Sequence, residues 1–249
     1  MCTLVVAWQA FLDAPVVVAA NRDEKLGRPS VPPEPIDADP RVVAPRDAEA
    51  GGTWIGANEH GVFVAITNRW SEADLAGERS RGLLVRDALE RETAAGAARL
   101  VESATEADGY EGFNLLCADA DAATLLEWDG ELRTRRLDPG VHVVMNVGPI
   151  GDVAIPDDWP ERSERQAANG RRVLEALGPD PDESSGAWRE RAASVLGDHE
   201  YGVCVHHEEF EFGTRSSSLL TIDAGGRIDY AFADGPPCRT DFEPVESQV

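Results

Sequence analysis

The sequence predicts an α+β fold in which antiparallel β-sheets are covered by helices. Apolar patterns along the chain change from strands to helices, back to strands, to helices again, and finally to strands. This order differs from the βαβ alternation of a doubly wound sheet and is typical of layered α+β proteins. The chain has 249 residues, of which 42% are hydrophobic. This is enough for one large core, so a single domain over residues 1–249 is expected.

The first two strands are predicted to form a β-hairpin. Residues 3–8 and 16–20 are apolar and rich in β-branched side chains, and Pro15 ends the short connection between them. In an antiparallel pair, the numbers of facing residues have a constant sum, here about 24 or 25. Position 2 is therefore expected opposite Arg22 or Asp23.

Turn residues and helix caps divide the rest of the chain. Residues 28–46 are rich in proline and are expected to form a long irregular loop. Asp129-Gly130 is a strong turn signal, and Ser80 is a candidate helix cap. The tail at 234–249 is expected to be loose. Alternating patterns predict strands at 51–58, 62–67, 112–118, 124–128, 132–137, 141–145, 201–205, 218–222 and 227–232, and helical patterns predict helices at 80–89, 93–101, 159–177 and 184–196.

The surface is predicted to be strongly acidic. The formal net charge is −23, and Lys25 is the only lysine. Such a charge repels nucleic acid and anionic membranes, so neither is expected as a partner. The acidic residues are spread along the whole chain, which is typical of a halophilic protein from a haloarchaeal cytoplasm. No apolar run reaches transmembrane length and no secretory signal is recognisable, so a cytoplasmic location without membrane insertion is expected.

The four cysteines do not indicate a disulfide framework, because their spacings are wide and no CxxC pair is present. Cys117 lies in a buried-strand pattern, and Cys238 lies in the proline-rich tail. Cys204 with His206 and His207 suggests a metal site at first sight. However, neighbouring residues on a strand point to opposite faces, so both histidines cannot bind one ion. Neither a metal nor another cofactor is therefore expected.

Cys2 is the strongest candidate for chemistry. A methionine before a small residue is normally removed, and Cys2 would then carry a free α-amine. Because the ordinary pKa of an α-amine is about 7.7–8.0, one residue would combine a thiol with a weak base, a known arrangement in covalent catalysis. Arg22 would favour the thiolate, and Asp23 could hold the α-ammonium. The alternative is a small, inert cysteine at the start of a strand.

Several short motifs resemble those of one family. They are Met1-Cys2, Asn21-Arg22-Asp23-Glu24, Arg28-Pro29, Gly51-Gly52-Thr53-Trp54, Ile66-Thr67-Asn68-Arg69 and Gly213-Thr214-Arg215-Ser216-Ser217. On these residues the chain is identified as a member of the NRDE family of transport and Golgi organisation proteins, over nearly its whole length. More distantly it resembles the cysteine branch of the N-terminal-nucleophile hydrolases, which implies a four-layer αββα sandwich.

The resemblance also implies an active site. The residues that match are Cys2, Arg22, Asp23, Asn68, Asn146 and Arg215. The cysteine is the implied nucleophile, the two asparagines follow strands and can donate to an oxyanion, and the late arginine adds positive charge beside the thiolate. Arg22 and Asp23 are adjacent here, and adjacent strand residues face opposite ways. Which of the two faces the cysteine is therefore left open.

The implied function is hydrolysis of a non-peptide amide or ester in a small or lipid-like molecule. The alternative is a carrier of haem or an acyl lipid on the same scaffold, because family members are linked to the handling of both. A haem carrier could use Cys2, His142 or His206 as an axial ligand, although no CxxCH motif is present. No oligomeric state is predicted.

Overall fold

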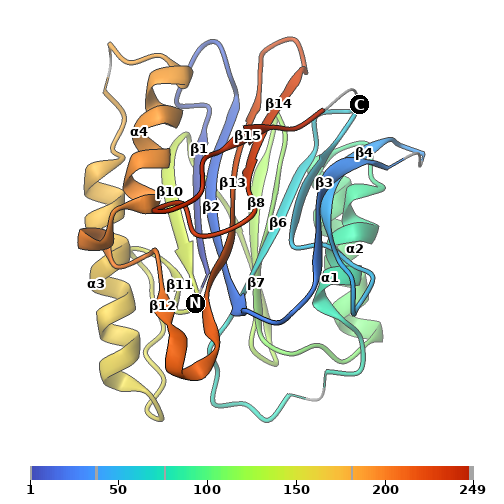
Figure 1. The fold of residues 1–249 in the computed structure, drawn as a ribbon. Coiled ribbons are helices and arrows are strands. Elements are labelled where there is room, and N and C mark those ends of the chain that lie inside the picture. Colours follow the sequence, from blue (N-terminus) through green and yellow to red (C-terminus); the bar gives the residue numbers. More distant parts are fainter. Residues whose placement is uncertain (1, 37–38, 76, 181, 247–249) are drawn as a thin grey trace.

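The chain folds into four layers, with two β-sheets packed face to face and a pair of helices on each outer side (Figure 1). The structure is a computed structural model that describes residues 2–36, 39–75, 77–180 and 182–246. All strand pairs in both sheets are antiparallel in these residues. The αββα sandwich expected from the sequence is therefore confirmed.

The first sheet contains the start of the chain at its centre. Its strand order is β11-β10-β1-β2-β13-β14-β15, and β12 also pairs with β13. Thr3 faces Asn21 in the first hairpin, which confirms the predicted register and places position 2 level with Arg22. The strands are β1 (Thr3–Trp8), β2 (Val16–Lys25), β10 (Gly140–Met145), β11 (Gly148–Pro149), β12 (His206–His207), β13 (Phe212–Ile222), β14 (Ile228–Ala233) and β15 (Glu243–Pro244).

The second sheet follows the order of the sequence, from β3 to β9. Its strands are β3 (Ser30–Ile36), β4 (Val42–Asp47), β5 (Ile55–Asn58), β6 (Phe63–Asn68), β7 (Phe113–Ala118), β8 (Ala123–Trp128) and β9 (Leu132–Arg136). The prediction of an irregular loop at 28–46 is wrong, because β3 and β4 form there. The prolines of β3 lie on an edge strand whose register shifts between Val31 and Glu34. An edge strand tolerates proline because one side of its backbone needs no partner.

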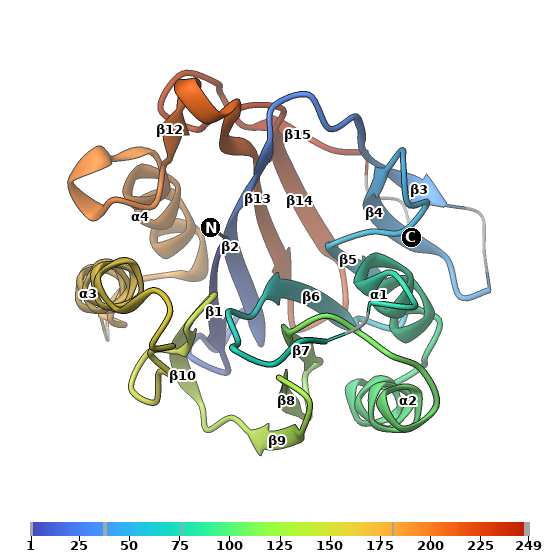
Figure 2. The same cartoon turned by 90° about the horizontal axis from the view of Figure 1, so that it is seen from below.

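Four α-helices cover the outer faces of the sheets in the described ranges (Figure 2). α1 (Arg81–Leu89) and α2 (Ala94–Ala107) cover the second sheet, and α3 (Pro160–Ala176) and α4 (Ser185–Gly197) cover the first. The hydroxyls of Ser80, Thr93 and Ser184 cap three of them by accepting from backbone N–H groups. Two 3₁₀ turns are η1 (His199–Tyr201) and η2 (Glu208–Phe210). Within the part of the chain described, no helix has the length and apolar character to cross a membrane.

Three apolar clusters hold the layers together. One lies between the two sheets, and the others lie under each helix pair. The tail is part of this packing, because β15 pairs with β14 and Phe242 and Val245 pack against the clusters. The expectation of a loose tail is therefore wrong for residues 234–246, while residues 247–249 lie outside the described ranges. The strand predicted at 201–205 is also absent, because Gly202 adopts a left-handed backbone with φ of 66°.

Candidate active site

Cys2 lies immediately before central strand β1, on the wall of a cavity of about 310 Å³. The first sheet contributes the ends of β1 and β2 to this cavity, and the second sheet contributes β5 and β6. The lining includes Cys2, Arg22, Asp23, Glu24, Arg28, Asp47, Trp54, Ile55, Ile66, Asn68, Arg79, Ser80, Arg81 and Glu111. The thiol therefore opens between the two sheets, at the end where the strand-end residues of both gather.

The backbone nitrogen of Cys2 is held by a chain of buried amides. It donates to Oδ1 of Asn146 at 3.0 Å, and Nε2 of Gln166 donates to the same oxygen at 2.9 Å. The Nδ2 of Asn146 donates to the backbone carbonyl of Asn68 at 2.7 Å. Asn146 therefore directs its oxygen toward the Cys2 nitrogen, while the side chain of Asn68 is exposed to the cavity. Gln166 comes from α3 and was not predicted from the sequence, where no motif marks it.

Arg22 and Asp23 both belong to the site, although they are adjacent on β2. The Arg22 guanidinium lies over the Trp54 ring at 4.2 Å, and its Nη1 is buried without a hydrogen bond to any described residue. The Cys2 sulfur lies 3.7 Å from the backbone oxygen of Asp23. The Asp23 carboxylate points toward β13, where the Thr214 hydroxyl donates to it at 2.6 Å. Asp23 thus reaches the thiol through its backbone, which resolves the question of orientation.

Burial sets the protonation of the central groups. It raises the pKa of the Cys2 thiol, and the opposing effect of Arg22 is smaller. Arg22 does favour the thiolate, as expected, but the loss of water around the buried sulfur raises the thiol pKa by more than the guanidinium lowers it. Burial also raises the pKa of Asp23 to about 6, against the hydrogen bond from Thr214. The shift at Cys2 favours the protonated thiol over the thiolate.

Arginines line the cavity, although the protein is strongly acidic as a whole. Arg22, Arg28, Arg79 and Arg81 all face it. Arg28 pairs with Asp47 at 2.8 Å, and Arg81 pairs with Glu111, also at 2.8 Å. Arg79 precedes α1 and Arg81 is its first residue, and neither was predicted from the sequence. Arg79 pairs with Asp87, and four acidic residues lie in the same lining: Asp23, Glu24, Asp47 and Glu111.

Arg215 lies apart from the other predicted residues. It is the extra residue of a bulge in β13, because Thr214 faces Asp23 while Ser216 faces Arg22. Its Nη1 donates to Asp234 at 2.8 Å, and it is not among the residues that line the cavity. The structure therefore brings five of the six predicted residues together and leaves Arg215 outside. The neighbouring Thr214 points inward in its place.

The four-layer arrangement, with a cysteine before a central strand, matches a known fold. The fold is that of N-terminal-nucleophile hydrolases, as comparison with solved structures shows. Penicillin V acylase from Agrobacterium tumefaciens is 17% identical, with a TM-score of 0.55 over 94% of this chain and 83% of that one. A Caenorhabditis elegans N-acylethanolamine-hydrolyzing acid amidase ortholog is 12% identical, with a TM-score of 0.58 over 88% of this chain and 92% of that one. A variant of conjugated bile acid hydrolase from Clostridium perfringens is 11% identical, with a TM-score of 0.59 over 98% and 92%.

The particular family within this class is given by the sequence. The family model of Transport and Golgi organisation 2 matches residues 1–231, and the chain belongs to this family. The mouse Transport and Golgi organization 2 homolog is 28% identical over 239 residues, which cover 86% of this chain and 84% of the mouse protein. The human homolog is 27% identical over 240 residues, with the same coverage. The resemblance drawn from the short motifs is confirmed.

Proposed function

We propose that this protein is an N-terminal cysteine amidohydrolase that cleaves a non-peptide amide or ester of a small or lipid-like molecule. One observation carries the proposal: the thiol and the nitrogen of the same residue, Cys2, are both fixed at the wall of a cavity. Removal of Met1, which lies outside the described residues, would convert this nitrogen into an α-amine. Asn146 would then hold that amine beside the thiol it must deprotonate.

The proposed reaction uses the α-amine of Cys2 as base and then as acid. The amine takes the thiol proton as the sulfur attacks the acyl carbon, and the resulting ammonium gives this proton to the leaving amine or alcohol as the C–N or C–O bond breaks. Water then attacks the thioester with the amine as base, the C–S bond breaks, and the ammonium returns the proton to the sulfur as the carboxylic acid leaves. We assign the oxyanion to Nη1 of Arg22, which has no hydrogen bond to a described residue, and to the Asn68 amide; both residues line the cavity. Asn146 is a positioning residue in this scheme.

The lining of the cavity suggests the kind of substrate. Trp54, Ile55 and Ile66 offer apolar surface, which suits an acyl chain. Arg79, just before α1, and Arg81, at its start, lie in the same lining. A carboxylate or phosphate in the substrate would meet these guanidinium groups. An acyl compound with an anionic group is therefore the substrate class that the cavity favours.

A panel of acyl substrates tests the proposal. It contains amides and esters with short and long acyl chains, each with and without a carboxylate or phosphate. Cys2→Ala should abolish hydrolysis, and Cys2→Ser should retain at most traces because a hydroxyl is far less acidic than a thiol. Arg22→Met should lower kcat by roughly a hundredfold or more with a similar KM, because an oxyanion donor acts in the transition state. Asn146→Ala should lower kcat by a similar factor through the misplaced base.

Matched arginine variants separate these roles from a general effect of charge. Arg81→Met should raise KM for anionic substrates and leave KM for their neutral counterparts similar. Arg41→Met serves as the control, because Arg41 precedes β4 and is not among the residues that line the cavity. Arg215→Met decides between the sequence expectation and the geometry, and should resemble Arg41→Met because Arg215 pairs with Asp234 away from the cavity.

The competing function is carriage of haem or an acyl lipid. Of the candidate haem ligands, His142 contacts the carbonyl of Asp138 at 2.8 Å, and neither it nor His206 lines the cavity at Cys2. Two results together would overturn the hydrolase proposal. The wild-type protein would hydrolyse no substrate of the panel, and it would bind haem or an acyl lipid tightly with an affinity that Cys2→Ala leaves unchanged.

A further inference from the structure

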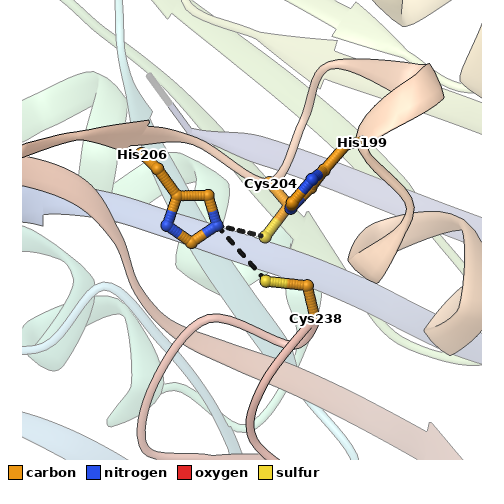
Figure 3. A group of neighbouring side chains, drawn as sticks. All are labelled: His199, Cys204, His206 and Cys238. Atoms are coloured by element: carbon orange, nitrogen blue, oxygen red, sulfur yellow. Dashed lines mark hydrogen bonds between the residues drawn. The ribbon is translucent and has the colours of Figure 1, made fainter.

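A second group of reactive side chains lies away from Cys2. His199, Cys204, His206 and Cys238 each offer one nitrogen or sulfur atom, and these four atoms all lie within 4.8 Å of one another. Figure 3 shows the two sulfurs directed at the Nε2 of His206, with the His199 ring beside Cys204. The Nε2 lies 3.5 Å from the Cys204 sulfur and 3.2 Å from the Cys238 sulfur. Both cysteines are free thiols.

The expectation that no metal binds here rested on His206 and His207 alone, and it does not concern ligands from other segments. His206 and His207 do diverge as neighbours on a strand should, because the His207 ring packs against Phe210 instead. The second imidazole and the second sulfur come from elsewhere. His199 lies in η1, and Cys238 lies in the turn that follows β14. Four soft or borderline donors therefore converge from three segments.

We propose that His199, Cys204, His206 and Cys238 form a four-ligand Zn²⁺ site. Two thiolates and two imidazoles are a common structural set for this ion, which prefers tetrahedral sulfur and nitrogen ligands. Zinc bonds of about 2.3 Å to sulfur and 2.0–2.1 Å to nitrogen place tetrahedral ligand atoms roughly 3.3–3.8 Å apart. The two distances to the Nε2 of His206 lie close to that range. The remaining atoms need shifts of at most about an ångström, which exposed His199 can supply.

The surroundings support a fixed site rather than a chance cluster. The Cys204 side chain is 6% exposed, and the backbone N–H of Cys238 hydrogen-bonds to its sulfur. Such N–H donors orient thiolate ligands in metal sites. The turn that carries Cys238 is closed by a hydrogen bond from Arg239 to Pro236 at 3.0 Å. The Pro237 carbonyl in this turn approaches Gly197 at the end of α4 so closely that a Cβ there would lie 3.1 Å away.

The zinc site would fasten the C-terminal segment to a segment that supports the active site. Val205 lies between two of the ligands and exchanges two hydrogen bonds of 2.8 Å with Thr214, one with its backbone and one with its hydroxyl. Thr214 in turn donates to Asp23 at 2.6 Å. Thr214 alone therefore separates the ligand segment 204–206 from the Asp23 carboxylate. The site is structural in this scheme, because all four positions of the ion are filled by the protein.

Metal titration of the full chain tests this proposal. The protein is treated with a chelator and a reductant, its four free thiols are counted, and Co²⁺ is added as a spectroscopic substitute for Zn²⁺. One equivalent should bind, with a thiolate charge-transfer band and the intense visible bands of tetrahedral Co²⁺, and Zn²⁺ should displace it. Cys238→Ser and His206→Ala should each weaken binding by about a hundredfold or more, beyond what loss of an outer partner costs. The thermal midpoint of wild-type protein should rise with Zn²⁺.

Two matched variants serve as controls. His207→Ala changes the adjacent imidazole and Cys2→Ser removes a distant thiol, and both should bind Co²⁺ like the wild type. The wild-type spectrum alone keeps the proposal testable if the ligand variants fold poorly. Failure of the reduced protein to bind one equivalent, an unchanged cobalt spectrum in Cys238→Ser, or a Cys204–Cys238 disulfide that persists in the reductant would overturn the proposal. None of these readouts depends on hydrolase activity.

Discussion

Removal of the Glu127 carboxylate should destabilise the fold and disturb the ends of the strands that carry the site. Arg69 follows β6, and its Nη1 donates to Glu127 and to Asn114, each at 2.9 Å. Both side chains of the ion pair are only 4% exposed. Asn114 also donates to the backbone carbonyl of Met145 at 2.9 Å. Through Asn114, the ion pair of the second sheet is thus linked to β10 of the first sheet, close in sequence to Asn68 and Asn146.

The free energy of unfolding that Glu127→Leu should lose depends on the charge of Arg69, which the substitution leaves without its main partner. Breaking a buried pair by removing one partner costs about 3–5 kcal/mol, because the remaining charge is uncompensated. Asp129 stays 3.2 Å from the Arg69 Nε and is itself 22% exposed, so part of the compensation survives. We therefore expect the lower end, about 3 kcal/mol. Arg69→Met combined with Glu127→Leu should cost less than Glu127→Leu alone, because no buried charge is then left unpaired.

Urea unfolding in molar KCl measures these free energies without changing the ionic strength. The matched control is Glu59→Leu, which breaks an ion pair whose arginine, Arg41, is 51% exposed and should cost at most about 1 kcal/mol. An equal cost for Glu127→Leu and Glu59→Leu would refute the reasoning. A double variant less stable than Glu127→Leu would refute the part that concerns the unpaired charge.

Three further predictions concern the chain start, the surface charge and Asp23. Intact mass should show loss of Met1 in protein from the native host, and a retained methionine would contradict the α-amine mechanism. The thermal midpoint should rise from low to molar salt, because salt screens the repulsion of a net charge of −23; a fall would contradict the halophilic interpretation. Burial raises the pKa of Asp23 from 3.8 to about 6, which corresponds to roughly 3 kcal/mol. The folded state holds this proton more tightly, so wild-type protein should lose that stability as the pH rises from about 4 to 7, whereas Asp23→Asn should not. Parallel curves of unfolding free energy against pH for the two proteins would contradict the assignment.

The sequence was most informative where structure is local. The first hairpin could be predicted with its register, because a short turn fixes which residues face each other and so places Cys2 level with Arg22. Strands β3 and β15 could not be predicted in this way. Their proline content argues against a strand, and only an edge position, which depends on distant pairing, makes it acceptable.

The site was predictable to a similar extent. Cys2, Arg22 and Asp23 follow from the hairpin, and the asparagines follow from strand ends. Gln166 reaches the site from a helix, and its contact with Asn146 depends on how that helix packs on the sheet. The zinc ligands are likewise scattered, with 31 residues between His206 and Cys238. Spacing alone cannot reveal contacts that only the packing of layers creates.

The bulge in β13 has a consequence for how this region can change in evolution. The side chains of β13 alternate between the two faces of the sheet, and the extra residue Arg215 reverses this alternation. Thr214 and Ser216 can therefore both face residues of β2. Deletion of a single residue here would remove this reversal, and the side chains of residues 212–214 would then point to the opposite face of the sheet. The Thr214 hydroxyl would then leave Asp23, and Val205 would lose its partner in the same event. The identity of residue 215 is therefore open to drift, whereas the length of this strand is not.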